Sequence, residues 1–115
     1  METPAVNDSP DGQPVLCHLV FFTLIDNSPT AVAKLVEACN KYLSDHPGTV
    51  RFDVGTRILD LQRPVNDQEF DVSLQVVFQT RADHDRYQKS EKHVTFIEEN
   101  KGNWKQSRVF DSYKT

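Results

Sequence analysis

Apolar and polar residues alternate along residues 50–61 and 70–78, and this period of two predicts β-strands because successive side chains of a strand point to opposite faces. An earlier strand is predicted over residues 15–25, a run that is apolar at most positions. The later two each have one apolar face, formed by Val50, Phe52 and Val54 in one and by Phe70, Val72, Leu74, Val76 and Phe78 in the other. A shorter run, residues 107–113, is predicted to be a last strand.

Residues 28–46 have the apolar spacing of a helix that packs on one side. Asn27 or Ser28 can cap its first amides, and Pro29 suits the first turn, where its missing N–H does no harm. Pro47 and Gly48 are expected to end it. The buried stripe consists of Val32, Leu35, Val36, Cys39, Tyr42 and Leu43.

Residues 82–100 are highly charged, with sparse apolar anchors at Tyr87, Val94, Phe96 and Ile97. This composition predicts a surface helix. A break near Lys89–Ser90 would divide the segment into two shorter helices.

The elements follow in the order β-α-β-β-α-β, which predicts an α+β fold of the ferredoxin-like type with a four-stranded antiparallel sheet. Residues 15–115 are expected to form a single domain. Residues 1–14 are polar and contain three prolines, so we interpret them as a flexible N-terminal arm.

The first strand is apolar on both faces, although two helices can cover only one face of such a sheet. Val20, Phe22 and Leu24 are expected to face the helices together with His18, which leaves Cys17, Leu19 and Phe21 on the other face. Phe110 of the last strand should join this bare face. An apolar patch of this kind favours pairing with a second copy of the chain. The alternative is that residues 1–14 fold back over the patch, which their polarity disfavours.

Composition excludes several classes of partner. The net charge of −4 argues against nucleic acid, and the chain contains no apolar run long enough to span a membrane. The N-terminus does not resemble a signal peptide, and Cys17 and Cys39 do not suggest a disulfide. We therefore expect a cytoplasmic protein.

Four residues are candidates for proton chemistry: His18, Tyr87, His93 and Asp111. His18 and Asp111 are expected on neighbouring strands, and Tyr87 and His93 on the helical segment that covers them. An imidazole beside a carboxylate and a phenol can move protons near neutral pH. Each residue also has a purely structural interpretation, and the pattern leaves open which histidine meets Asp111. His46 and His84 are expected at the surface.

Other chemistries lack their motifs. The four glycines are dispersed, so no phosphate-binding loop is predicted, and neither a GxSxG elbow nor a nucleophilic cysteine is present. His18 and His93 could contact a metal, but further ligands are not evident. Neither a cofactor nor a metal is therefore predicted.

The ordered set HLVFFTL, HPGTVRFDVG, FDVSLQVVF, YQKSEKHVTFI and RVFDSY resembles the stress-responsive A/B barrel (Dabb) domain family over residues 15–113. This resemblance implies a homodimeric α+β barrel in which two sheets meet. A distantly similar member, olivetolic acid cyclase, implies His93 as general base held by Asp111, with Tyr87 and His18 orienting carbonyl groups. Members commonly carry a proline where this chain has Glu91.

Two functions remain open at this point. The first is a homodimeric Dabb protein of uncharacterised biochemical role that binds a small organic ligand in a pocket between helices and sheet. The alternative is a cofactor-independent enzyme with cyclase-like aldol or proton-transfer chemistry that uses His93 and Asp111. A barrel of the antibiotic-biosynthesis monooxygenase type fits the motifs less well.

Overall fold

The computed structural model describes residues 12–115, so most of the predicted arm (residues 1–11) lies outside the described residues. The elements are β1 (Leu16–Leu24), α1 (Pro29–Leu43), β2 (Thr49–Thr56), β3 (Val72–Phe78), α2 (Arg81–Lys89), α3 (Glu91–Asn100), a 3₁₀ turn η2 (Lys101–Asn103) and β4 (Trp104–Tyr113). The predicted order is confirmed, with the second helical segment divided in two.

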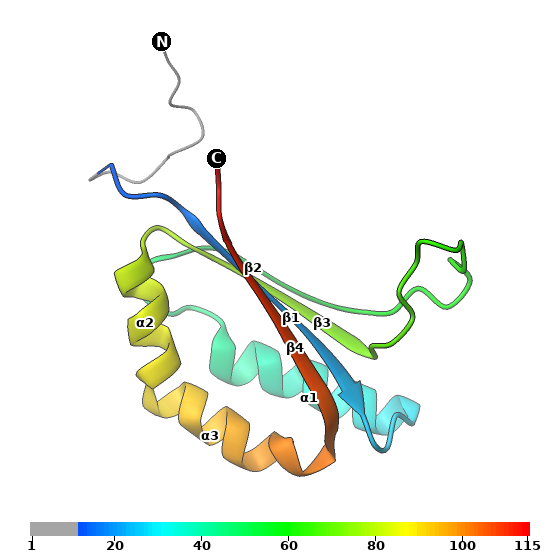
Figure 1. Cartoon of the computed structure of the whole chain (residues 1–115). Coiled ribbons are helices and arrows are strands. Elements are labelled where there is room, and N and C mark those ends of the chain that lie inside the picture. The colour runs from blue at the N-terminus through cyan, green and yellow to red at the C-terminus, as the bar shows by residue number, and fades with distance from the viewer. Residues whose placement is uncertain (1–11) are drawn as a thin grey trace.

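The four strands form one antiparallel sheet in the order β2-β3-β1-β4, which is the ferredoxin-like arrangement. The three α-helices all lie on the same side of this sheet (Figure 1). The predicted α+β fold class is therefore confirmed. None of the helices in residues 12–115 is long and apolar enough to cross a membrane.

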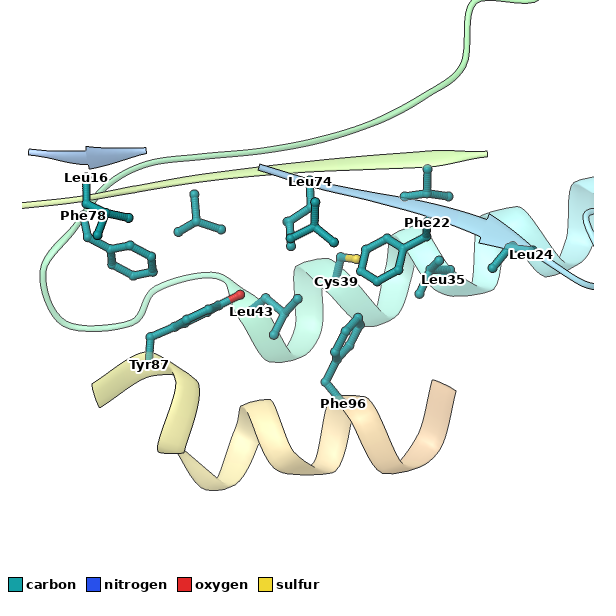
Figure 2. Close-up of a cluster of buried hydrophobic side chains, with 13 residues drawn as sticks. Leu16, Phe22, Leu24, Leu35, Cys39, Leu43, Leu74, Phe78, Tyr87 and Phe96 are labelled. Atoms are coloured by element: carbon teal, nitrogen blue, oxygen red, sulfur yellow. The ribbon is translucent and has the colours of Figure 1, made fainter. Parts of the chain in front are cut away.

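The core lies between the sheet and the helices, and the face of β1 that was expected to point toward the helices is the buried one. Side chains of β1 are buried and partly exposed in turn, with His18, Val20 and Phe22 on the buried side. Val20 and Phe22 belong to one buried cluster with Leu35, Cys39 and Leu43 of α1, Tyr87 of α2 and Phe96 of α3. Figure 2 shows Phe22 among these side chains. On the other side of β1, Phe21 contacts Phe110 of β4 at 5.9 Å between ring centroids.

Ser90 separates α2 from α3 and caps both helices. Its backbone is extended, with φ −66° and ψ 151°. Its hydroxyl donates to the carbonyl oxygen of Tyr87 at 2.9 Å and accepts from the amide of His93 at 3.1 Å. The break predicted near Lys89–Ser90 thus has a capping serine as its cause.

Helix α1 begins as predicted, with the Ser28 hydroxyl accepting from the Ala31 amide and Pro29 in the first turn. It ends at Leu43, three residues before the expected end at residue 46. The turn that follows requires Gly48, whose φ is +85°. A Cβ atom at this position would lie only 2.1 Å from the side chain of Asp83 in α2, so the glycine also permits close packing.

Three side chains differ from the predicted pattern. Val50 is exposed because the register of β2 against β3 shifts between Thr49 and Arg51, which leaves it as the extra residue of a bulge. Phe70 precedes β3 and packs on Phe21 at 5.2 Å, on the bare face of the sheet instead of in the core. Val94 is exposed on α3 and does not anchor it.

Candidate functional site

The pairing of β1 with β4 places His18 directly opposite Asp111. Residues paired across antiparallel strands share a face, so both side chains lie on the side that carries the helices. Nδ1 of His18 is 2.5 Å from Oδ1 of Asp111. The imidazole is 3% exposed, whereas the carboxylate side chain is 45% exposed. The two residues form a dyad with a fixed imidazole and a more accessible acid.

This dyad corrects the pairing that the family resemblance implied. Asp111 bonds His18 and not His93. His93 comes from the first turn of α3 and is 9% exposed, and its Nδ1 has no hydrogen-bond partner among the described residues. The reason is geometric, since His18 stands in register with Asp111 on the adjacent strand.

Tyr87 extends from α2 into the layer between helices and sheet (Figure 2), and three of the four histidines of the chain pack around its ring. Ring centroids of His93, His46 and His18 lie 4.8, 4.9 and 6.0 Å from that of Tyr87. His84 packs edge-on against His18 at 5.2 Å.

The surface positions predicted for His46 and His84 are wrong, because both rings are partly buried in this aromatic cluster. A signal for His84 was present in the sequence. His84 precedes Tyr87 by three residues, a spacing that places both side chains on the same face of a helix.

A cavity of about 390 Å³ opens beside the dyad, between the sheet and helices α2 and α3. All four predicted residues line it, with the polar groups His18, His84, Tyr87, Gln88, His93, Ser107 and Asp111 and the apolar groups Val20, Phe22, Leu43, Leu74, Phe96, Ile97, Trp104 and Val109. Trp104, which the sequence analysis did not single out, packs on Phe22 at 4.9 Å. The sequence did contain a signal for this residue, because Trp104 is the single tryptophan of the chain and lies just before the strand predicted over residues 107–113.

Burial keeps the two inner histidines neutral. It lowers the pKa of His18, and this effect outweighs the hydrogen bond to Asp111, which acts in the opposite direction. Burial, followed by the nearby His18, lowers the pKa of His93 to about 4. Burial also raises the pKa of the Tyr87 hydroxyl. At neutral pH the site therefore offers two uncharged imidazoles and an intact phenol.

Three buried polar atoms around the cavity have no hydrogen-bond partner among residues 12–115. They are the hydroxyl of Tyr87, Nδ1 of His93 and Nε1 of Trp104. Such atoms are uncommon in folded proteins because each loses its bonds to water on burial. All three belong to residues that line this cavity.

Solved structures with the same fold come from several organisms. A Dabb family protein with a ferredoxin-like fold from Mesorhizobium loti has 22% identity and a TM-score of 0.72, covering 87% of this chain and 96% of that one. A dimeric ferredoxin-like protein of unknown function from Thermobifida fusca has 11% identity and a TM-score of 0.74, covering 98% and 99%. The hydroxynitrile lyase from Passiflora edulis has 18% identity and a TM-score of 0.72, covering 89% and 94%.

Curated proteins yield no significant sequence match. The sequence model of the stress responsive A/B barrel domain, in contrast, matches residues 16–114, which includes every helix and strand described above. The resemblance inferred from the ordered motifs is confirmed by this match. The chain therefore belongs to the stress responsive A/B barrel domain family, Dabb.

Proposed function

We propose that this protein binds a small organic ligand in the cavity between the sheet and helices α2 and α3. The observation that carries the proposal is the set of three unpartnered buried polar atoms, on Tyr87, His93 and Trp104, around one cavity. Its volume of about 390 Å³ lies in the usual range of ligand pockets. Phe22, Phe96 and Trp104 provide aromatic walls, so the ligand is expected to combine an apolar body with hydrogen-bonding oxygen atoms.

The dyad supports a second candidate function, a cofactor-independent proton-transfer enzyme. Asp111 accepts the hydrogen bond of His18 Nδ1–H, which fixes the tautomer and leaves Nε2 as the basic atom. In this proposal Nε2 takes a proton from a carbon next to a carbonyl group of the ligand. The enolate oxygen that results accepts a hydrogen bond from Tyr87, and the proton returns from His18 to the product. His93 orients the ligand and is not the base.

A hydroxynitrile lyase is among the solved structures with this fold, so the scaffold is compatible with catalysis. At 18% sequence identity, the likeness to this lyase does not assign its substrate to the present chain. Two experiments separate binding from turnover.

Binding is tested by a thermal-shift screen of aromatic and polyketide-like carboxylic acids. Ile97→Trp should fill the cavity and abolish the shift that a bound compound produces, because Ile97 lines it. Val94→Trp is the matched control, since Val94 is exposed on the same helix and does not line this cavity. If no compound raises the melting temperature, or if both variants still bind, the ligand proposal is wrong.

Turnover is tested by hydrogen–deuterium exchange at the carbon next to the carbonyl group of a compound that binds. We expect Asp111→Asn to slow the exchange by roughly 100-fold with binding retained, because the base loses its orienting carboxylate. Asp53→Asn, which removes an exposed carboxylate of β2, should leave the rate unchanged. Binding without exchange in the unmodified protein would favour the binding function over the enzyme.

We also propose that two copies pair through the bare face of the sheet, at Cys17, Leu19, Phe21 and Phe110. Phe110 is 52% exposed there, and its ring contacts Phe21, which in turn contacts Phe70. Burial of such a cluster releases roughly 25 cal/mol for each Å² of apolar surface. The related fold from Thermobifida fusca is described as dimeric, which supports the same assembly. Sedimentation at micromolar concentration tests it, and a single subunit would overturn it.

A further inference from the structure

We propose that His18, His84 and Asp111 form a site for a divalent transition-metal ion such as Zn²⁺. One ring nitrogen of each histidine and one carboxylate oxygen of Asp111 all lie within 4.8 Å of one another. Two imidazoles and a carboxylate are a ligand set that such ions prefer. The site goes beyond the proposed function, because neither ligand binding nor proton transfer needs His84 as a ligand.

The ion would take the place of the proton between His18 Nδ1 and Asp111 Oδ1. Bonds from zinc to nitrogen or oxygen are about 2.0–2.2 Å, so neighbouring ligands of a tetrahedral site lie roughly 3.3 Å apart. The pair at 2.5 Å must therefore open by less than about 1 Å. His18 is fixed in the core, whereas the half-exposed Asp111 can supply this movement.

His84 is held as a ligand would be. Its Nδ1 is 3.0 Å from Oδ1 of Asp85, which leaves Nε2 with the lone pair. Asp85 is bonded in turn by Nε of Arg81 at 3.0 Å. Carboxylates behind metal-binding histidines commonly fix the ring and raise its basicity in this way.

Access and an open coordination position are both available. His84 and Asp111 also line a second cavity of about 300 Å³, next to Arg81 and Tyr113, so the cluster lies between this cavity and the larger one. An ion can enter from either side. The position that the three side chains leave free would be taken by water or by an oxygen of a ligand in the larger cavity.

The test is a Co²⁺ titration of the full chain without a histidine tag, followed by the visible absorption of the bound ion. We expect saturation at one equivalent, and competition by Zn²⁺. His84→Ala should weaken binding by at least tenfold, and Asp85→Asn by about tenfold. His46→Gln is the matched control, because it removes another partly buried histidine beside Tyr87 that lies outside the three ligands.

Absence of saturable binding up to millimolar Co²⁺ would overturn the site, as would equal affinity of the unmodified protein and His84→Ala. Circular dichroism verifies that each variant folds, and His84→Gln repeats the test with a side chain closer in size. The ligand screen and the exchange assay are run with a chelator present. Their failure therefore contradicts the proposed function alone, and failure of the Co²⁺ titration contradicts the metal site alone.

Discussion

At the scale of single residues, burial makes His93 difficult to protonate. It is buried against Tyr87, and its Nδ1 has no partner among the described residues. Protonation would place an uncompensated positive charge among aromatic rings and next to His18, which is why the pKa falls to about 4. Burial therefore favours the neutral form of this ring.

This burial predicts an acid-sensitive fold. An unfolded histidine titrates near pH 6.5, so between that value and about 4 the unfolded chain binds a proton that folded His93 does not. The free energy of unfolding should therefore fall as the pH is lowered through this window, by about 3 kcal/mol for His93. The lowered pKa of His18 acts with the same sign.

Urea unfolding at a series of pH values from 7 to 4 measures this effect. His93→Gln should flatten the curve, whatever its effect on stability at pH 7. Thr95→Ala on the same helix contains no ionisable group and should keep the slope of the unmodified protein. Equal slopes for all three proteins would contradict the argument.

The sequence identified four of the side chains that line the cavity but not how they pair. Alternation placed His18 on the inner side of its strand and Asp111 on a neighbouring strand. The choice between His18 and His93 as its partner depends on the register of β1 against β4, and no local pattern encodes that register. His84 was missed because a polar neighbourhood in the sequence hides the apolar contact that its ring makes with Phe78.

At the scale of elements, the joint between α2 and α3 positions the helical half of the site. The Ser90 hydroxyl bonds the carbonyl of Tyr87 and the amide of His93, so one side chain links the residues that carry the phenol and the second imidazole. The positions of Tyr87 and His93 in the cavity therefore depend on the Ser90 cap.

Ser90→Ala should lower the free energy of unfolding by about 1 kcal/mol, the usual effect of losing such a cap. Ser28→Ala is the matched control, because Ser28 caps α1 and does not line the cavity. Both variants should be destabilised in urea, but only Ser90→Ala should shift the NMR signals of the His93 ring. Identical ring spectra in the two variants would show that the joint does not orient the site.

Periodicity predicted the order of the strands and helices, although the strand expected over residues 50–61 ends at Thr56 and the last strand begins at Trp104. Contacts between strands explain two further differences. Val50 continues the apolar alternation of its strand, yet the bulge against β3 turns it out of the core. Phe70 continues the alternation of β3, but the strand begins only at Val72, and the amide of Asp71 instead bonds the carbonyl of Phe22. Both features depend on contacts with another strand, which a single segment does not reveal.

At the scale of the whole molecule, the helices cover one side of the sheet and leave the other without a layer of their own (Figure 1). Phe110 projects from the edge strand β4 on that bare side, opposite Leu19 of β1. A charge at this position would be buried in the proposed dimer but solvated in a monomer.

Phe110→Glu should therefore shift the protein from dimer to monomer, with a loss of at least tenfold in the association constant measured by sedimentation equilibrium. Val65→Glu is the control, since Val65 is a highly exposed residue of the loop between β2 and β3. If the association constant of Phe110→Glu equals that of the unmodified protein, the dimer interface does not include Phe110.

The pairing of β1 with β4 also has a consequence for synthesis on the ribosome. His18 and Asp111 are 93 positions apart, and β1 occupies an inner place in the sheet between β3 and β4. A nascent chain that stops short of β4 has no carboxylate for His18, and one edge of β1 stays open. Unpaired edges attract chaperones, proteases and other strands. A chain that lacks β4 is therefore expected to aggregate more readily than the full chain, and it also lacks Asp111.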